Sequence, residues 1–252
     1  MKGYPMSSFA RGLFALAMGA LLGSTGVSRS QEATTVKLSP SGVLDISRGG
    51  VPVGLVELSA HGAEWTHAPQ KEAKAVVSDL PGGAGKQFVG TLAIPKTDGG
   101  EIRYTQTVKP LSQGVRIEYD LTMSKDMKVS GLQFSLYLPV EAYAGKEVLI
   151  PQLRDDPKLV GLPKEHQKGK FQLWSGQGAK IELAKGTPEA VTIELRAATD
   201  VVVQDLRQWE QPVFEVRFPA IMQDPGRDVK AGDRFHLDLT VTFATPARIE
   251  GP

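Results

Sequence analysis

Hydrophobic and polar residues alternate with a period of two along most of the chain after residue 30. The longest alternating runs cover residues 115–123, 132–138 and 235–243. Shorter runs of the same kind cover residues 102–104, 181–183, 191–195 and 214–218. Successive side chains of a strand point to opposite faces, so each run has one apolar and one polar face. This pattern is typical of antiparallel sheets with one face on the core.

Glycine-rich turn signals separate these runs at short intervals, as in Asp98-Gly99-Gly100 and Gly176-Gln177-Gly178. The clearest unit is a hairpin of residues 102–108 and 115–123 joined by a turn at 109–114. No segment after residue 30 has a helical period of more than about two turns. Residues 69–78 suit either a helical turn or another strand.

Roughly twelve to fifteen strands are expected, which suits an all-β fold. We therefore predict one large antiparallel two-sheet β-sandwich over residues 36–246, with both inner faces apolar. Two smaller sandwiches are the alternative, although no linker tract or internal repeat divides the chain. The longest irregular segment, residues 151–170, is expected to be a functional or mobile loop.

The first thirty residues have the order of a secretory signal peptide. Lys2 and Arg11 flank a short basic region, an apolar run follows from Gly12 to Gly23, and small and polar residues come next. The apolar run is shorter than the roughly 20 residues that a membrane span needs. We predict a signal peptide at residues 1–30 with cleavage after Ser30; a cut near Ala33 and a retained anchor are the alternatives. The protein is then exported, periplasmic or extracellular, with no membrane span after cleavage.

Composition and charge narrow the classes of function. The chain has no cysteine, which excludes disulfides, thiolate metal sites, a thiol nucleophile and a lipoprotein anchor. Loss of residues 1–30 leaves 26 basic and 28 acidic residues, a net charge of −2. Such a chain has no electrostatic reason to bind nucleic acid. Nucleophile-elbow, phosphate-loop and dinucleotide motifs are absent from the sequence, so no cofactor is expected.

The order of strand and turn phrases from Ile102 onward resembles a known group of proteins. A hairpin ending in EYDLTM is followed by FSLYLPVEAYAG, FQLWSGQGAKIEL, VTIELRAATDVVVQDLRQW and VKAGDRFHLDLTVTF. This order is similar to the β-sandwich domains of secreted bacterial glycan-degrading proteins, with the supersandwich architecture of the galactose mutarotase-like family. The resemblance implies that the chain has the supersandwich fold and that its ligand is a carbohydrate.

The resemblance carries over no catalytic residue. Mutarotases use paired histidines and a carboxylate to open and close a sugar ring. The four histidines of this chain match none of the family's motif positions, and its Asn-His phrase before an aromatic residue is missing. Function must therefore be argued from the residues of the site.

Five residues are candidates for binding a sugar. The alternation puts Trp174 on the polar face of its strand, where an indole can stack on a pyranose; a covering loop is the alternative. Trp209 follows Asp205 and Arg207, and this mixture of ring, carboxylate and guanidinium suits hydroxyl-rich ligands. A turn that plugs the end of the sandwich is the alternative there. Tyr137 lies on the polar side of its strand with Gln133 and Ser135, where it lines a sheet face or packs under a loop.

Weak candidates for catalysis lie in the charged loop. Asp155, Asp156, Glu165 and His166 could supply the two carboxyl groups of a glycoside hydrolase, or they belong to a solvated loop.

His61 and His67 are six residues apart, with Glu64 between them. In an extended strand they would be about 20 Å apart, too far for one ion unless the chain turns at Gly62. We expect no metal site.

The sequence leaves three hypotheses open. The first is an exported carbohydrate-binding β-sandwich protein in polysaccharide recognition or degradation, acting alone or beside a separate glycan-degrading enzyme. The second is a carbohydrate-active enzyme, a glycoside hydrolase, lyase or epimerase, with its site on the concave sheet face. The third is a structural module of the cell envelope.

Overall fold

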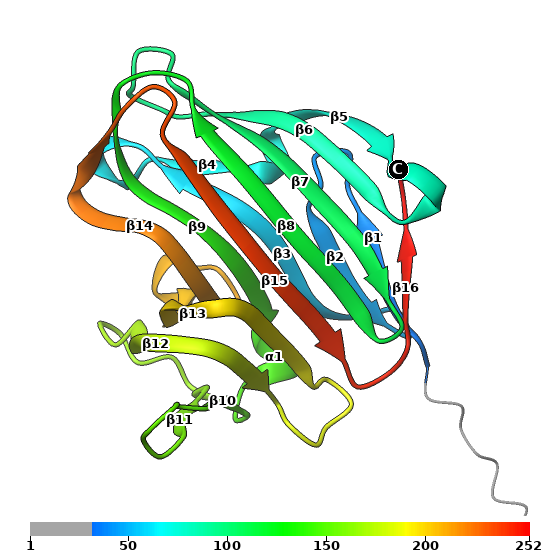
Figure 1. The fold of residues 1–252 in the computed structure, drawn as a ribbon. Coiled ribbons are helices and arrows are strands. Elements are labelled where there is room, and N and C mark those ends of the chain that lie inside the picture. Colours follow the sequence, from blue (N-terminus) through cyan, green and yellow to red (C-terminus); the bar gives the residue numbers. More distant parts are fainter. Residues whose placement is uncertain (1–31) are drawn as a thin grey trace, which may run out of the picture. The chain divides into compact units, whose positions relative to one another are not determined.

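Residues 32–252 are described by the structure, a computed structural model, and they are built almost entirely from strands (Figure 1). The predicted signal peptide, residues 1–30, lies outside the described residues. The first strands are β1 (Thr34–Leu38), β2 (Leu44–Arg48), β3 (Val51–His61), β4 (His67–Pro69), β5 (Lys74–Asp79), β6 (Lys86–Ala93), β7 (Glu101–Leu111) and β8 (Gly114–Met123). The later strands are β9 (Met127–Pro139), β10 (Glu147–Ile150), β11 (Lys158–Gly161), β12 (Gln172–Leu183), β13 (Val191–Asp205), β14 (Val213–Val229), β15 (Arg234–Phe243) and β16 (Ala247–Glu250).

Helical segments are few and short in this part of the chain. They are helix α1 (Val140–Tyr143) and the 3₁₀ turns η1 (Ala63–Trp65), η2 (Gln70–Glu72), η3 (Pro81–Gly83) and η4 (Leu206–Trp209). None of the described helices is long and apolar enough to cross a membrane. The predicted all-β class is confirmed.

One long strand, β13, joins two layers of sheet. Its residues 191–195 pair with β15, and its residues 202–205 pair with β14. The first layer continues from β14 through β9, β3, β2 and β1 to β16, and the second continues from β15 through β8, β7 and β6 to β5. Figure 1 shows the second layer lying over the first.

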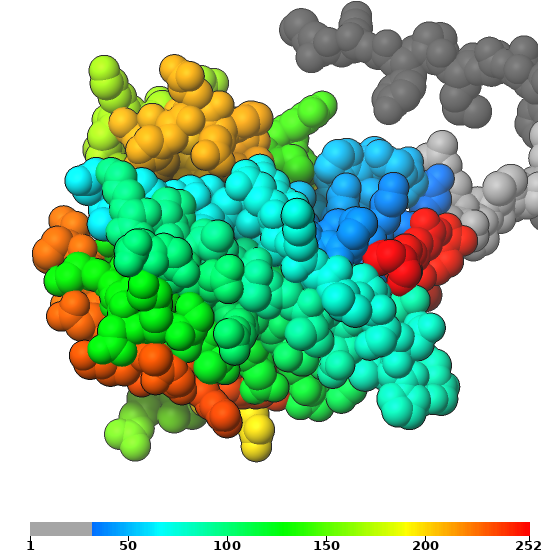
Figure 2. Space-filling model, turned by 90° about the horizontal axis from the view of Figure 1, so that it is seen from above, coloured from blue at the N-terminus to red at the C-terminus, as the bar shows by residue number. Residues whose placement is uncertain are grey.

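The first layer departs from the predicted antiparallel pattern at its edge, where β1 and β16 are parallel. The space-filling view of Figure 2 shows these two strands, blue and red, side by side. The pairing places the last strand, β16, at the edge of this layer, next to the first strand, β1.

The apolar faces of the two layers form the core. Tyr119 of β8 meets Phe134 of β9 with ring centroids 6.1 Å apart, and Phe134 meets Phe218 of β14 at 6.0 Å. All three side chains are buried. Offset and edge-to-face aromatic pairs at this distance add to the stabilisation from burial. The alternation that predicted the strands therefore also placed their apolar residues correctly.

One glutamine crosses the core between the layers. The Gln70 amide nitrogen donates to the Ser41 carbonyl and to Gln106 Oε1, at 2.7 and 2.8 Å. Its oxygen accepts from the Leu58 backbone N–H and from the Tyr119 hydroxyl, each at 2.8 Å. The buried amide has its partners, which removes the penalty of an unpaired polar group.

Three details differ from the sequence expectation. The hairpin of β7 and β8 turns at residues 112–113 rather than 109–114, because β7 continues to Leu111. Pro110 is tolerated there since the pairing of β6 with β7 ends at Val108, so its missing N–H lies on an unpaired edge. Segment 151–170 contains a strand, β11, paired with β10. Residues 69–78 include both η2 and most of β5.

Candidate functional site

Three neighbouring strands of the first layer carry polar residues on the face opposite the core. The members of this group, which we call the polar face, are Glu57, Ser59 and His61 of β3, Gln133, Ser135 and Tyr137 of β9, and Glu215 and Arg217 of β14. The register sets Ser135 between Glu57 and Arg217, and Tyr137 opposite Glu215. Directly opposed residues share a face, so the eight side chains form one surface.

The interior of the polar face holds an ion pair between Arg217 and the buried carboxylate of Glu215. Ser135 donates its hydroxyl proton to Glu215 Oε1 at 2.6 Å, and Arg217 donates through Nε and Nη2 to the same carboxylate at 3.1 and 2.8 Å. Glu215 has no exposed surface. A buried carboxylate needs such partners, because an unpaired charge would cost several kcal/mol, about 3 or more. Ser135 and Arg217 therefore hold Glu215 in place.

Glu57 lies beside this pair, but among residues 32–252 no cation is bonded to its carboxylate. The pKa of Glu57 is raised from 4.5 to about 7, mainly by burial and to a lesser extent by the negative charges of Glu215 and Glu72. The Lys71 backbone N–H, 3.4 Å from Oε2, and the Lys71 charge work in the opposite direction. A carboxyl group with this pKa can exchange its proton near neutral pH, as a general acid or base must.

A hairpin between β3 and β4 brings two histidines together at the edge of the polar face. His61 and His67 face each other in the register, and their rings stack 5.0 Å apart with 20° between their planes. The chain turns after Gly62, where a Cβ would collide with the Pro95 carbonyl oxygen. Because the chain reverses at this turn, the two histidines are not about 20 Å apart, as they would be in one extended strand.

The tip of the hairpin places a tryptophan, Trp65, next to the His61 ring. Glu64 and Trp65 both have positive φ, 56° and 57°, as in the tight turns of hairpins. The Trp65 indole lies 5.5 Å from the His61 ring, and both rings occupy space that a Cβ at Gly131 would take. An ion pair between Glu64 and Lys96 links the tip to the segment after β6. Trp65 is 37% exposed, so its ring is accessible.

The contacts of His61 define a neutral imidazole. Its Nδ1 lies 3.2 Å from the Trp65 carbonyl oxygen, which can only accept, so Nδ1 carries the proton. Its Nε2 then accepts from the Gln133 amide nitrogen at 2.9 Å. Burial, and next the neighbouring His67, lower the pKa of His61 to about 4. Partial burial, and next the Lys71 charge, also lower the pKa of His67, although this residue keeps an exposed side. At neutral pH the pair is therefore uncharged.

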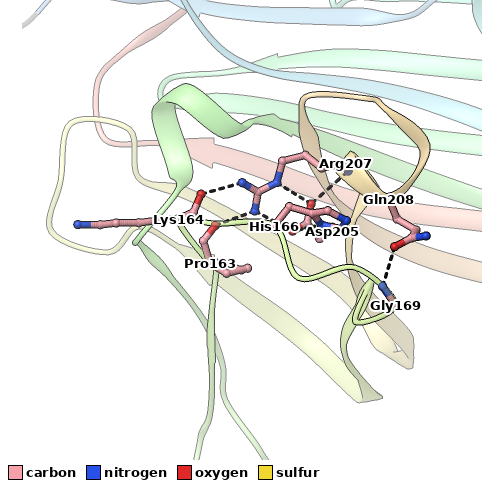
Figure 3. A network of polar contacts seen from close by, with 7 residues as sticks. All are labelled: Pro163, Lys164, His166, Gly169, Asp205, Arg207 and Gln208. Carbon is pink, nitrogen blue, oxygen red and sulfur yellow. Dashed lines mark hydrogen bonds and ion pairs between the residues drawn. The ribbon is translucent and has the colours of Figure 1, made fainter.

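The sugar-binding candidates Asp205 and Arg207 lie elsewhere, at the end of β13 (Figure 3). Arg207 donates to both Asp205 oxygens at 2.9 and 2.7 Å, and to the carbonyls of Lys164 and Pro163 at 2.8 Å each. Burial raises the pKa of Asp205, but the bonds from Arg207 more than offset this, so the pKa lies below its usual value. The two side chains fasten the loop before β12 to the sheet.

The predicted tryptophans occupy different settings. Trp209 is 51% exposed, and its ring meets Phe171 edge-on at 4.9 Å. Trp174 packs partly against the core and lies over Gly176. A register shift between Gln172 and Trp174 breaks the alternation that placed Trp174 on the polar side of its strand. Tyr137 lies on the polar face, where burial raises its pKa above the usual value.

The four weak catalytic candidates lie in the segment before β12. Asp155, Asp156 and Glu165 are exposed. His166 is half-buried, with Nδ1 3.5 Å from the Asp205 carboxylate. In residues 32–252 no group of three or more His, Asp or Glu side chains is placed to hold a metal ion.

Sequence reasoning did not single out Glu57, Glu215 or Arg217 as functional. The alternation in VELSAH (residues 56–61) and FEVR (214–217) was a usable signal, because each run has charged residues on one strand face. Only the register shows that these strands are neighbours, with β9 between β3 and β14.

Comparisons with known proteins define the fold. No known family model matches the chain, and no curated protein sequence matches it. Among solved structures, a proposed aldose 1-epimerase from Escherichia coli K12 matches with a TM-score of 0.51 and 9% identity over 84% of this chain and 98% of that one. A galactose mutarotase-like protein from Lactobacillus casei matches with a TM-score of 0.47 and 13% identity over 73% and 79%.

A 4-α-glucanotransferase from Thermococcus litoralis matches with a TM-score of 0.45 and 10% identity over 75% of this chain. This chain spans only 27% of that enzyme's length. The all-β architecture and the match to the E. coli protein show that the chain has the galactose mutarotase-like fold. The predicted fold is thus confirmed, while function has to come from the chain's own residues.

Proposed function

We propose that this protein is an exported carbohydrate-binding protein that takes part in the recognition or degradation of a polysaccharide. Its sugar-binding site is the exposed hairpin that carries Trp65 and His67, at the edge of the polar face. The observation that carries the proposal is the stacked pair His61 and His67 beside an accessible indole, at the edge of the polar face.

The chemistry of this surface suits a sugar. A pyranose ring presents C–H groups that pack on an aromatic face and hydroxyl groups that need directed hydrogen bonds. Trp65 offers the aromatic face, and His67 is exposed beside it. Ser59 lies 3.3 Å from His67 Nε2 and Gln133 bonds His61, so both imidazoles are oriented before a ligand arrives. Pre-orientation reduces the entropy lost on binding.

The structural likeness supports a sugar as the class of ligand. The E. coli protein that shares the fold over 98% of its length is described as a proposed aldose 1-epimerase, which acts on a sugar. Export is supported by the charged, apolar and small-residue order of residues 1–30. N-terminal sequencing of the protein recovered from the periplasm or the medium tests export, and a chain that begins at residue 31 is the expected result.

Binding is tested with the purified protein on a panel of soluble polysaccharides. Affinity electrophoresis reports retention, and a reducing-end assay on the same samples reports cleavage. We expect retention by at least one polysaccharide, lost in both Trp65→Ala and His67→Ala. The matched control is His236→Ala, an exposed histidine on β15 in the other layer, paired with Asp120. Retention that survives both hairpin substitutions would contradict this site.

A second candidate function is proton transfer on the bound sugar, as in an epimerase. The observation that favours it is the pKa of about 7 at Glu57, which lies beside the Glu215–Arg217 ion pair on the polar face. Glu57→Gln keeps the size of the side chain and removes its proton exchange. Sugar interconversion followed by NMR should stop in Glu57→Gln while retention on the polysaccharide stays. Interconversion that continues at the normal rate would remove Glu57 from this role.

A further inference from the structure

A pocket of about 500 Å³ lies at the start of β12, apart from the stacked histidines. The end of β11, the loop that follows it and the first residues of β12 form its walls. The side chains that matter for a ligand are those of Gln167, Lys170, Phe171 and Gln172. Of the described residues that line the pocket, Lys170 alone carries a charge, and none is acidic.

The walls of the pocket are held in place from outside. Arg207 binds the carbonyls of Pro163 and Lys164, and Gln208 accepts from the Gly169 backbone N–H at 2.8 Å (Figure 3). The Lys170 N–H donates to the Gln167 carbonyl at 2.9 Å. These bonds fix both sides of the loop, so a ligand does not have to order it.

The lining offers three kinds of contact. Phe171 gives an aromatic wall, extended outward by the half-exposed ring of Trp209. Gln167 and Gln172 give amide donors and acceptors. Lys170 gives a cation with no carboxylate in the lining to neutralise it. Aromatic, amide and ammonium groups together suit a sugar that carries a negative charge.

The register connects this pocket with the polar face. Gln172 pairs with Gln204, Gln204 with Glu215, and Glu215 with Tyr137. Directly opposed residues share a face, so Gln172 belongs to the same side of the sheet as the polar face. Three strand spacings separate Gln172 from Tyr137, about 14 Å in all. A glycan chain of a few residues covers that distance.

We propose that this pocket is a second glycan subsite that selects an anionic sugar, carboxylated or sulfated, through Lys170. The inference rests on the proposed function in one respect, that the ligand is a carbohydrate. The pocket and the hairpin can be tested separately because they share no residue.

The experiment is isothermal titration of the purified protein with three oligosaccharides of equal length: an oligouronate, a sulfated one and a neutral one. We expect at least one anionic oligosaccharide to bind more tightly than the neutral one. Lys170→Ala should weaken anionic binding about tenfold and leave neutral binding unchanged, the loss expected for one charge-assisted contact. Lys170→Arg should restore most of the affinity. Lys168→Ala, an exposed lysine two residues away outside the lining, is the matched control.

Anionic binding that is equal in Lys170→Ala and the parent protein would overturn the subsite, as would a preference for the neutral oligosaccharide. Trp65→Ala separates this outcome from failure of the proposed function. If Trp65→Ala abolishes neutral binding while Lys170→Ala changes nothing, the hairpin site stands and the pocket fails. If no oligosaccharide binds the parent protein, both proposals fail together.

Discussion

His61 and His67 stack their imidazole rings 5.0 Å apart because they face each other across the β3–β4 hairpin. Two neighbouring imidazoles avoid repulsion only while at most one is charged, and burial keeps the pKa of His61 at about 4. The pair is therefore a neutral, oriented surface at physiological pH. Its exposed side is formed by His67 and Trp65, which is where a sugar would bind.

Gly131 makes room for this arrangement. A Cβ there would lie 2.8 Å from His61 Cδ2 and 3.2 Å from the Trp65 ring. Gly131→Ala should displace both rings and weaken polysaccharide binding about fivefold, equivalent to roughly 1 kcal/mol. Titration calorimetry measures this effect. Gly161→Ala, where the new methyl group meets no described atom within 4 Å, is the control for thermal stability alone, since Gly161 lines the pocket at the start of β12. Unchanged binding in Gly131→Ala would show that the ring positions do not matter.

Glu57 makes stability depend on pH in a defined direction. Its pKa is raised from 4.5 to about 7 in the folded protein, so the folded state binds more protons than the unfolded state between these values. Its contribution to stability is therefore present at low pH and is lost as the pH rises through 7.

Replacement of Glu57 by glutamine should remove that loss. Relative to the parent protein, Glu57→Gln should gain up to about 3 kcal/mol of unfolding free energy between pH 5 and pH 8. Urea unfolding at both pH values measures the difference. His61 has the opposite sign, since its lowered pKa costs stability below pH 6.5, but it is present in both proteins and cancels. A difference that shrinks with rising pH would contradict the assignment.

Arg207 should act as a clamp on the loop before β12. Arg207→Ala removes four hydrogen bonds from the guanidinium and leaves Asp205, 1% exposed, without its cation. We expect a loss of about 2 kcal/mol in unfolding free energy. Trypsin should also cut faster after Lys164, Lys168 and Lys170, as limited proteolysis can show. Arg154→Ala, an exposed arginine earlier in the same segment, should change neither property.

The two tryptophans of the sugar-binding prediction should separate in their effects. Trp174 packs partly against the core, so Trp174→Ala should lower the unfolding free energy by about 2 kcal/mol. Trp209 is half-exposed beside Phe171, so Trp209→Ala should leave stability within about 0.5 kcal/mol and weaken anionic glycan binding. Thermal melts and titration on the same preparations measure both. Equal destabilisation in the two variants would contradict their placement.

The strands could be read from the sequence because each has an apolar side toward one core. Residues 115–123 and 235–243 are strands β8 and β15 almost to the residue. Alternation fails where the register shifts, as between Gln172 and Trp174. Alternation also says nothing about what covers the second face, so the sequence left open whether the side with Ser135 is exposed; Ser135 is buried.

The candidate site was less predictable because it depends on which strands are neighbours. The β3–β4 hairpin could be foreseen in part, since Gly62 permits the turn that joins His61 to His67. The Glu215–Arg217 pair could not be related to Glu57, because more than 150 residues of sequence separate their strands. Long-range pairing is not encoded in local patterns.

The measurement that tests the account most directly is NMR of the histidine ring protons during titration with a bound polysaccharide fragment. The chain has four histidines, which makes assignment by substitution practical. Binding at the hairpin predicts shifts at His61 and His67 and none at His236 of β15. Saturable binding that leaves the His61 and His67 resonances unmoved would contradict a sugar site on this face.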